Sequence, residues 1–597
     1  MSSRIPRFFS LSVDEKLEHV LKTGELTKEE SDVIKSALPL SIAEQLTENV
    51  ISTLDIPLSV CANLVINGKD MFIPMANEES SVVSAASNGA KLLRESGGVE
   101  AISCTPTIFS QIIFEIPSRI DDESLLTTIR VSRHKKQSFF QKNIWDKLLT
   151  PISEYSSLKT IIPSSFLASR DFSLPADNVC PKLTEYLKSQ LPKLRFIAKD
   201  LLERIEKRGG GLWSIRARVI TDHIEEIEEE GGEKEGEERT SMISFSRFVS
   251  VDLIFGVCEA MGANLSSSVS ERIMPELKQY IQNYLQKYHD PLPSSPSLLN
   301  PHDHTADQIT GSADQTTGSA DHTDDSVTPC DDEKDGGESF VFHVTSIVSN
   351  TSQRLSFARS TISALDLHKQ RSKQFPNVEV AAECLRNIST LAKYARLDPY
   401  RQTTHNKGIM NGSLSVVLAT GNDTRAFACS NSSLTREFTP TLTQYRYDSI
   451  SSTLICACVQ CTPVGTIGGM TSIHDKCKVC IKLSTSQTKP PMLTDHSIEH
   501  SSSYSKMQPE YDIFAAQRLG NAITCIGLCQ NVSALLALTT KGICAGHMRL
   551  HLSNIMLRMG ISRTSKEWET VMKYWKTPGV KQIVTEQNIR KVIGGSS

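Results

Sequence analysis

The sequence lacks several features that would indicate a particular class of protein. It has no run of about 18 apolar residues, the length that a helix needs to cross a bilayer, and its first twenty residues contain no apolar core of the signal-peptide type. Neither sign of charge prevails, because 64 Lys and Arg residues stand against 68 Asp and Glu residues, giving a net charge of -4. We therefore expect a cytoplasmic protein with a small organic ligand and with no nucleic-acid or membrane partner.

The G-x-G-x-x-G fingerprint is also absent, so the sequence gives no support to a standard dinucleotide-binding fold. Fifteen cysteines are scattered through the chain, and without a signal peptide we expect reduced core thiols rather than a disulfide framework. A chain of 597 residues, 39% of them hydrophobic, can bury more than one core. A multidomain globular protein is the expectation.

The first hundred residues carry clear local signals for helices and a hairpin. Three capping boxes predict three short helices: Ser12 with Glu15, Thr27 with Glu30, and Ser41 with Glu44. Asn67-Gly68 between two apolar segments predicts a β-hairpin. The segment 80–96 then predicts a helix that ends at Gly97 and Gly98. This is an α+β beginning.

Two acidic segments interrupt the pattern. Residues 225–239 contain nine glutamates among fifteen residues, too few apolar side chains to form a core. Residues 291–338 contain tandem heptads such as ADQITGS and ADQTTGS, without the apolar positions of a coiled coil. A partner-binding role is the alternative, but we interpret both segments as solvated loop expansions.

The segment 396–426 contains a lysine and an aspartate on either side of an apolar run. Residues 415–419 are predicted to form a strand, with Lys407 before it and Asp423 after it. A lysine held beside a carboxylate keeps its charge in a buried site and could stabilise a developing oxyanion. A structural salt bridge explains the same pattern, so these residues alone leave both interpretations open.

Four separated motifs resemble those of one enzyme family. They are DPYRQTTHNKGIMNG with ATGNDTRA (398–426), the segment ENVISTLDIP through PMANEESSVVSAASNG (48–89), GLCQNVSALLALTTKGICAGHMRLHLSNI (527–555) and VDLIFGVCEAMGANLSSSVSE (251–271). They resemble motifs of class II 3-hydroxy-3-methylglutaryl-coenzyme A (HMG-CoA) reductases, the soluble branch of that family. Along the chain, the four motifs follow each other in the same order as in that family. The resemblance covers nearly the whole chain apart from the acidic segments.

The resemblance implies an α+β fold in which a small ferredoxin-like coenzyme domain is inserted into a large substrate domain. On this basis we predict that the large domain consists of residues 1–105 and 346–540 and the small domain of residues 106–345. Residues 541–597 are predicted to form a helical C-terminal flap. The implied reaction is the reduction of HMG-CoA to mevalonate and free coenzyme A by two hydride transfers. Homodimers or higher assemblies, with the active site at the subunit interface, are also implied.

The resemblance also assigns catalytic roles. Glu79 is implied to be the acid, Lys407 the oxyanion stabiliser, Asp423 the hydrogen-bonding partner of both, and His547 the proton donor to departing coenzyme A. These types of side chain suit the reaction, because negative charge builds on the substrate oxygen and a thiolate leaves. His551 lies one helical turn from His547 and could serve chemically, so the motif alone decides between them.

Substrate contacts are implied at five positions. Arg401 is expected to pair with the terminal carboxylate of the hydroxymethylglutaryl group. The other four are Ser81, Asn350, Asn411 and Gln530.

The coenzyme loop of the family corresponds here to Glu259, Ala260, Met261, Gly262, Ala263 and Asn264, with glutamate in place of the family's aspartate. After the glycines at 209–211 this chain has Ser214, with Arg216 and Arg218 nearby, where relatives that use NADH carry an aspartate. The two arginines favour NADPH over NADH, because they could bind a 2′-phosphate. The alternative is that both lie on a strand with their charges in solvent.

One motif competes with this assignment. The pairs Cys458-x-x-Cys461 and Cys477-x-x-Cys480 are separated by fifteen residues, a spacing typical of a four-cysteine zinc site. Neither pair is followed by the tight turn of a zinc knuckle, and they fall on a predicted strand and a predicted helix. We expect buried free thiols and no metal.

The alternative function is a catalytically lapsed, cysteine-rich binding protein on the same fold, possibly with a structural zinc. Glu259, the altered stretch FACSNSSLTREF after Asp423, and Phe9 at the family's usual arginine position for coenzyme A keep this alternative open, although Arg7 lies close. The presence of all four catalytic residues favours the enzyme.

Overall fold

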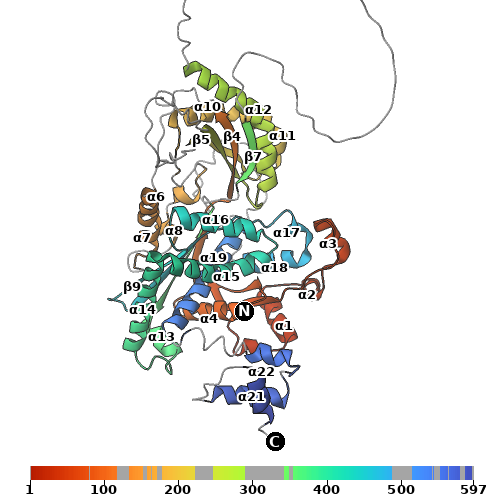
Figure 1. Cartoon of the computed structure of the whole chain (residues 1–597), viewed down its shortest axis with the longest axis vertical. Helices are drawn as coiled ribbons and strands as arrows, with labels where there is room; N and C mark the ends of the chain where they lie inside the picture. Colours follow the sequence, from red (N-terminus) through yellow and green to blue (C-terminus); the bar gives the residue numbers. More distant parts are fainter. Residues whose placement is uncertain are drawn as a thin grey trace, which may run out of the picture.

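The structure is a computed structural model (Figure 1). It describes residues 2–79, 81–116, 133–151, 158–162, 164–170, 176, 178–221, 247–288, 342–348, 354–486, 514–540, 542, 552–562, 564–577 and 585–594. The acidic segments 225–239 and 291–338 lie outside these ranges, so the expectation of solvated loops there stays a prediction.

The N-terminal helices are α1 (Val13–Thr23), α2 (Lys28–Lys35) and α3 (Leu40–Leu46), after the short 3-10 turn η1 (Phe8–Ser10). The first two begin with the predicted capping boxes, in which the hydroxyl of Ser12 or Thr27 accepts a hydrogen bond from the third helical N–H. The third predicted box is wrong. Helix α3 begins directly after Pro39, so Ser41 lies inside its first turn and caps nothing.

The predicted hairpin is confirmed. Strands β1 (Leu58–Ile66) and β2 (Lys69–Ala76) pair antiparallel and turn at Asn67 and Gly68, whose φ angles are 50° and 81°. Helix α4 (Val82–Arg94) follows and packs against β1. The short connection between β2 and α4 contains Glu79.

The larger core is built on an antiparallel sheet with the strand order β3-β8-β10-β9. Its strands are β3 (Glu100–Ser103), β8 (Leu355–Ser363), β9 (Thr443–Asp448) and β10 (Thr453–Cys461). Its helices are α13 (Ala364–Gln370), α14 (Val378–Leu397), α15 (Pro399–Ala419), α16 (Thr424–Glu437), α17 (Met470–Ile473), α18 (Asp475–Thr485) and α19 (Ala515–Leu538). Helix α19 contacts α4, α15 and three of the strands, so it is the central helix of this core (Figure 1).

Helix α15 corrects one prediction from the sequence. Asp398 caps its N-terminus by accepting a hydrogen bond from the N–H of Arg401 (2.6 Å), and Pro399 occupies the first helical position. Residues 415–419, predicted to form a strand, are the last turn of this helix. Packing against α19 and β2 outweighs the β preference of its two valines.

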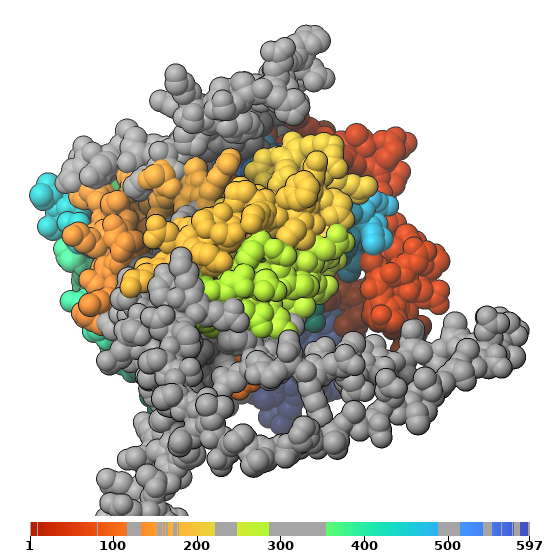
Figure 2. All heavy atoms as spheres, turned by 90° about the horizontal axis from the view of Figure 1, so that it is seen from above, coloured from red at the N-terminus to blue at the C-terminus, as the bar shows by residue number. Residues whose placement is uncertain are grey.

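The second core belongs to a smaller antiparallel sheet with the strand order β5-β6-β4-β7. Its strands are β4 (Thr107–Ile116), β5 (Gly211–Thr221), β6 (Arg247–Gly256) and β7 (Phe342–Val348), and its helices are α10 (Pro181–Ile197), α11 (Lys199–Glu206) and α12 (Ala263–Tyr288). The chain order and the antiparallel pairing give the βαββαβ arrangement of ferredoxin-like domains. Figure 2 shows the three helices side by side on one face, in yellow and yellow-green.

One part of the predicted coenzyme range packs elsewhere. The short helices α6 (Arg133–Phe140), α7 (Asp146–Leu148), α8 (Leu158–Ile161) and α9 (Ser164–Leu167), with the π-helical turn η2 (Gln141–Trp145), join the larger core. Phe140 and Trp145 are fully buried, and the Trp145 indole donates to Thr439 Oγ1 at 3.0 Å. The range 106–345 therefore contains residues of both cores.

One described helix, α19, is long and apolar enough to cross a membrane by length and composition, with a mean hydropathy of 1.5 in its most apolar window. That window is 83% buried inside the protein. Its place at the centre of the larger core explains its apolar composition.

The C-terminal helices α21 (Lys566–Lys576) and α22 (Glu586–Gly594) lie at the end of the molecule opposite the smaller sheet (Figure 1). Together with the segment 552–561 they form a small core, in which Met556, Val571 and Ile589 are buried. The described part of the C-terminal segment is mainly helical, as predicted.

Candidate active site

Lys407 and Glu79 form an ion pair at the centre of the candidate site. Lys407 lies on α15, Glu79 lies between β2 and α4, and the Lys407 Nζ is 3.6 Å from the Glu79 Oε2. Asn411, one turn after Lys407, donates to the same carboxylate oxygen at 3.5 Å. The side chains of Lys407 and Glu79 are 63% and 44% exposed, so a ligand can reach both.

Asp423 is the N-cap of α16. Its carboxylate accepts hydrogen bonds from the N–H groups of Arg425 (2.9 Å) and Ala426 (3.1 Å), and the Arg425 side chain lies 3.4 Å away. Partial burial raises the pKa of Asp423, but these hydrogen bonds outweigh burial and hold the pKa below its usual value. In the described part of the chain its partners are thus the helix N-terminus and Arg425, rather than the expected Lys407 and Glu79.

Three expected substrate residues lie on two helices that pack together. Arg401 and Asn411 are on α15, and Gln530 is on α19. A Cβ at Gly412 would lie 3.0 Å from the Cβ of Gln530, so the helices approach closely at this point. The Arg401 Nε and the Gln530 Oε1 are buried and have no hydrogen-bond partner in the described structure. Most buried polar atoms in proteins are paired, so both atoms are candidates for ligand contacts.

Ser81 has a strained backbone. Its φ of 81° and ψ of -20° place it in the left-handed region that favours glycine. It stands at the N-cap position of α4, yet its side chain makes no capping hydrogen bond. Residues other than glycine in this region of backbone space cluster at functional sites.

Three of the expected residues lie outside the described part of the structure: Asn350, His547 and the alternative histidine, His551. Their roles stay predictions.

The coenzyme loop between β6 and α12 is attached to the larger core. The N–H of Thr466, in the loop after β10, donates to the Glu259 carbonyl at 2.8 Å, and Ala260 pairs with Ile467 in a parallel bridge. A Cβ at Gly465 would lie 2.6 Å from the Met261 N, so only glycine fits there. The N–H of Gly465 donates to the Asn422 side chain at 2.7 Å, directly before Asp423. These contacts bring the expected coenzyme loop to the C-terminal end of α15, next to Asp423.

The Glu259 side chain points toward α19. Its carboxylate accepts hydrogen bonds from the N–H groups of Ala515 (2.8 Å) and Ala516 (3.0 Å) and from the Thr466 hydroxyl (2.6 Å). Glu259 therefore caps the central helix of the larger core, across the boundary between the two cores. Buried Arg354 binds the carbonyls of Ala260 and Val464 beside it, and burial lowers the pKa of Arg354 to about 9.

The other coenzyme candidates lie on the small sheet and at the start of α12. Ser214 on β5 is buried, Gly262 has a φ of 102°, and Asn264 is in the first turn of α12. All three residues lie at the end of the small sheet from which the coenzyme loop extends.

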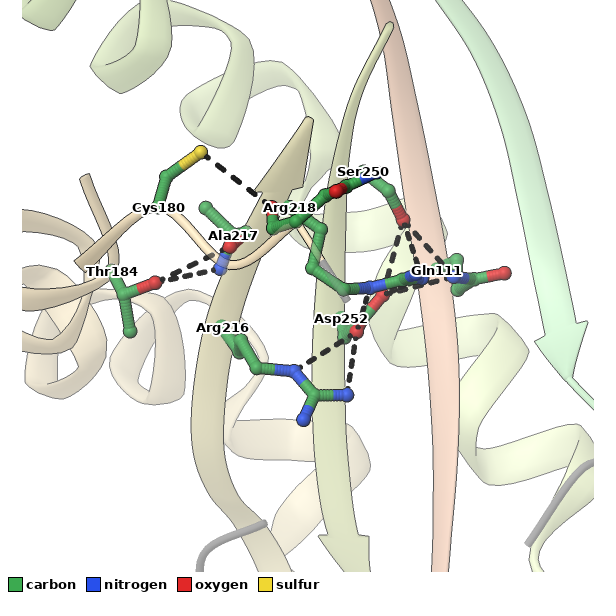
Figure 3. Close-up of polar contacts among 9 residues, drawn as sticks. Gln111, Cys180, Thr184, Arg216, Ala217, Arg218, Ser250 and Asp252 are labelled. Carbon is green, nitrogen blue, oxygen red and sulfur yellow. Dashed lines mark hydrogen bonds and ion pairs between the residues drawn. The ribbon is translucent and has the colours of Figure 1, made fainter. Parts of the chain in front are cut away.

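Arg216 and Arg218 project from β5 onto a buried carboxylate on β6 (Figure 3). The distances to the Asp252 Oδ2 are 2.9 Å from the Arg216 Nη2 and 2.7 Å from the Arg218 Nε, while Gln111 and Ser250 donate to the Oδ1. Burial raises the pKa of Asp252, but the two guanidinium groups outweigh it, and the pKa is lowered.

Both arginines lie on a strand, but the alternative in which their charges are in solvent is wrong. Their side chains are only 12% and 19% exposed, and that of Asp252 is fully buried. Two guanidinium groups thus share one buried carboxylate. Guanidinium groups also bind anionic ligands such as phosphates.

The four cysteines of the two C-x-x-C motifs are free thiols in the core. Cys458 and Cys461 are on β10 and Cys477 and Cys480 are on α18, as predicted, and all four are buried. Burial raises the pKa of each thiol, to about 11 for Cys477. Among the described residues, no group of three or more His, Cys, Asp or Glu side chains is arranged to hold a metal ion.

Sequence reasoning did not identify Asn77, Asn422, Arg354 or Asp252. Asn77 accepts a hydrogen bond from the Glu79 N–H at 2.6 Å and donates to Ser415 at 2.8 Å, which attaches the Glu79 turn to α15. An asparagine two residues before the turn is a signal that could have been used. An aspartate within the apolar run VDLIF likewise indicates a buried partner.

Comparison with known proteins agrees with this arrangement. The chain matches the model of the family described as hydroxymethylglutaryl-coenzyme A reductase over residues 12–170 and 342–552. It is 27% identical over 563 residues to the 3-hydroxy-3-methylglutaryl-coenzyme A reductase of Archaeoglobus fulgidus, covering 94% of this chain and 88% of that protein. It is 22% identical over 509 residues to the probable reductase of Borreliella burgdorferi, covering 85% and 77%.

The fold is also similar to a solved structure, the class II reductase of Streptococcus pneumoniae bound to NADPH. The TM-score is 0.56 at 20% identity, over 89% of this chain and 99% of that one. The family match covers more than half of the chain and includes Glu79, Lys407 and Asp423. This chain therefore belongs to the hydroxymethylglutaryl-coenzyme A reductase family.

Proposed function

We propose that this protein is an NAD(P)H-dependent HMG-CoA reductase, which converts HMG-CoA to mevalonate and free coenzyme A. The observation that carries the proposal is the exposed pair of Lys407 and Glu79, joined by Asn411 on the same carboxylate oxygen. An ammonium and a carboxyl group within 4 Å of each other, open to a ligand, can stabilise an oxyanion and supply a proton to it.

The reaction consists of two reductions with an elimination between them. A bound reduced nicotinamide cofactor supplies the hydride at each reduction. At the first, Lys407 stabilises the charge on the thioester oxygen as the thiohemiacetal forms. The thiohemiacetal then collapses to the aldehyde and expels the coenzyme A thiolate, which His547 protonates. At the second, Glu79 gives a proton to the aldehyde oxygen and the alcohol forms. The role of His547 rests on the resemblance of its motif.

Asp423 acts in this proposal as a fixed negative charge at the N-terminus of α16. It follows Asn422, whose side chain accepts a hydrogen bond from the Gly465 N–H. Asp423 therefore lies where the coenzyme loop meets the end of α15. We infer that it orients Lys407 and Glu79 once the substrate is bound.

The acyl group of the substrate is proposed to bind along α15. Arg401 pairs with its terminal carboxylate, while Ser81, Asn411 and Gln530 form hydrogen bonds to it. The unpaired Arg401 Nε and Gln530 Oε1 and the strained Ser81 backbone support these roles. Asn350 keeps its proposed role on the basis of its motif.

NADPH is the proposed cofactor, in preference to NADH. Its dinucleotide would be held by the loop of Ala260, Met261, Gly262 and Asn264 and by the face of β5 with Ser214, Arg216 and Arg218. The two guanidinium groups on this strand support recognition of a 2′-phosphate. Glu259 is reassigned from cofactor contact to holding the loop against α19.

The cofactor preference can be tested by Arg216→Met, which keeps an apolar stem and removes the charge. We expect the KM for NADPH to rise about tenfold and the KM for NADH to change little, as the loss of one charge-assisted contact predicts. Arg204→Met, on the exposed surface of α11, is the matched control. An equal rise in both KM values would contradict the preference.

A second copy of this chain is proposed to complete the site. Ile51 and Leu54, in the segment before β1, are 96% and 89% exposed, and the catalytic pair is open to solvent. Exposed large apolar side chains on the segment before β1, together with a catalytic pair that is open to solvent, support a subunit interface. The proposed location is the cytoplasm.

The domain division stays part of the proposal, with one change. Residues 1–105 and 346–540 form the substrate domain, and 541–597 form the flap. The coenzyme domain lies within 106–345, but residues 133–151, 158–162 and 164–167 are reassigned to the substrate domain because they pack against its core.

The direct test of the function is NADPH oxidation by the purified protein with HMG-CoA. We expect two NADPH oxidised for each coenzyme A thiol released. The alternative of a lapsed binding protein predicts HMG-CoA binding without oxidation of either cofactor, and that result would overturn the proposal.

A further inference from the structure

The inner face of α15 carries a buried histidine. His405 is 1% exposed, and its Nε2 lies 2.7 Å from the Thr443 Oγ1. The Thr443 hydroxyl donates its single proton to the Asn531 Oδ1 at 3.0 Å, so it can only accept from the histidine. The Tyr445 hydroxyl also donates to that oxygen, at 2.7 Å. The Nε2 of His405 therefore carries the proton.

The other ring nitrogen is a free acceptor. Burial and the neighbouring Arg401 guanidinium lower the pKa of His405 to about 4, so the ring is neutral at physiological pH and the Nδ1 keeps its lone pair. That Nδ1 is buried and has no hydrogen-bond partner in the described structure.

An unpaired donor lies one helical turn away. Arg401 is four residues before His405 on α15, so the two side chains are neighbours on one face of the helix. The Arg401 Nε is also buried without a partner in the described structure. The Arg401 Nε is thus a buried donor and the His405 Nδ1 a buried acceptor on the same face of the helix, both without a partner in the described structure. Such a pair fits a site in which ligand binding brings the two atoms into a hydrogen bond.

We propose that His405 is a positioning residue that accepts the Nε proton of Arg401 when Arg401 binds the carboxylate of the substrate. This inference rests on the proposed function, which gives Arg401 that carboxylate. A carboxylate takes the two terminal nitrogens of the guanidinium end-on, which leaves the Nε for His405. With the substrate carboxylate on one side and His405 on the other, the guanidinium has one orientation. The acyl group is thereby placed relative to Lys407, which lies two residues after His405 on α15.

Two variants separate this role from a purely structural one. In His405→Asn the amide oxygen replaces the Nδ1 acceptor, but the side chain is too short to reach Thr443. In His405→Gln the amide nitrogen replaces the Nε2 donor to Thr443, and the acceptor next to Arg401 is lost. We expect His405→Gln to raise the KM for HMG-CoA about tenfold and His405→Asn to raise it about twofold or less, with the KM for NADPH unchanged in both.

The opposite order, with His405→Gln like the wild type and His405→Asn impaired, would overturn the proposal in favour of a structural role. Equal effects of both variants, or none, would also overturn it. If His405→Asn fails to fold, Thr443→Val removes the structural contact and keeps the Nδ1. It is expected to leave the KM for HMG-CoA within about twofold, and a tenfold rise would contradict the proposal.

Binding of 3-hydroxy-3-methylglutarate, measured by calorimetry, distinguishes the two hypotheses. If the wild type oxidises no NADPH but binds this dicarboxylate, and His405→Gln weakens that binding about tenfold, the positioning role stands while the proposed reaction fails. If the wild type is active and His405→Gln binds the dicarboxylate normally, the positioning role fails alone.

Discussion

The carboxylate of Glu259 lies across the N-terminus of α19 and accepts a hydrogen bond from the Ala515 N–H at 2.8 Å. Glu259 follows a strand of the smaller sheet and Ala515 begins the central helix of the larger core, so this contact joins the coenzyme loop to the helix that carries Gln530. The Thr466 hydroxyl donates to the same carboxylate at 2.6 Å. The extra methylene of glutamate, compared with the family's aspartate, lengthens the reach of this side chain.

Removal of the Glu259 carboxylate should weaken both the fold and the coenzyme site. We expect Glu259→Ala to lower the free energy of unfolding by about 1 to 2 kcal/mol, the range of a lost helix cap, and to raise the KM for NADPH. Denaturant titration and steady-state kinetics measure the two effects. Glu271→Ala, on the exposed side of α12, should change neither. Unchanged stability of Glu259→Ala would contradict the capping role.

The Asp252 cluster predicts a dependence of stability on pH. Burial raises the pKa of this carboxyl, but the two arginines lower it overall, so the folded protein binds the proton less tightly than the unfolded chain. The stabilisation is therefore complete above the unfolded pKa of about 3.9 and is lost as the pH falls through the lower folded pKa. The free energy of unfolding should thus fall from about pH 5 downward.

Asp252→Asn should remove this dependence and take away the carboxylate that two partly buried arginines share. We expect a loss of about 3 to 5 kcal/mol at pH 7, with a flatter profile below about pH 5 than in the wild type. Chemical denaturation across this pH range measures both. Parallel profiles for the two proteins would show that Asp252 is not the titrating group.

The strain at Ser81 predicts opposite effects on stability and activity. Ser81→Gly relieves the left-handed backbone and should raise the free energy of unfolding by about 0.5 to 1 kcal/mol. Loss of the hydroxyl should raise the KM for HMG-CoA. Ala85→Gly, inside α4, is the control and should lower stability by a similar amount. A destabilised Ser81→Gly would mean that the strain argument is wrong.

The proposed interface predicts a change of assembly. Ile51→Glu combined with Leu54→Glu should give monomers by light scattering and should lower kcat/KM for HMG-CoA, because the site loses its second subunit. Ile450→Glu is the matched control, since Ile450 is equally exposed at 96% and lies in the turn between β9 and β10. A double variant that stays in the wild-type assembly would contradict this interface.

The sequence predicted the features that depend on neighbouring residues. The capping boxes at Ser12 and Thr27 and the turn at Asn67 were predictable because each is complete within four residues. The motifs also predicted that Glu79 and Lys407 act together, although 328 positions separate them, because the family resemblance carries tertiary information.

Other features depend on tertiary contacts that local patterns do not contain. Residues 415–419 resemble a strand by composition, but they are helical because α15 packs against α19. The contact of Glu259 with Ala515 spans 256 residues, and the pairing of Asp252 with the β5 arginines depends on strand register. Neither could be inferred from spacing alone.

The central claim is that Lys407 and Glu79 form the reducing site for HMG-CoA. The most direct measurement is HMG-CoA-dependent NADPH oxidation by the wild type and by Lys407→Ala, with correct folding of the variant checked by circular dichroism. We predict clear activity in the wild type and a loss of at least about a hundredfold in kcat for the variant, the effect of removing an oxyanion-stabilising group. Equal activity in the two proteins, or no HMG-CoA-dependent oxidation by the wild type, would contradict the claim.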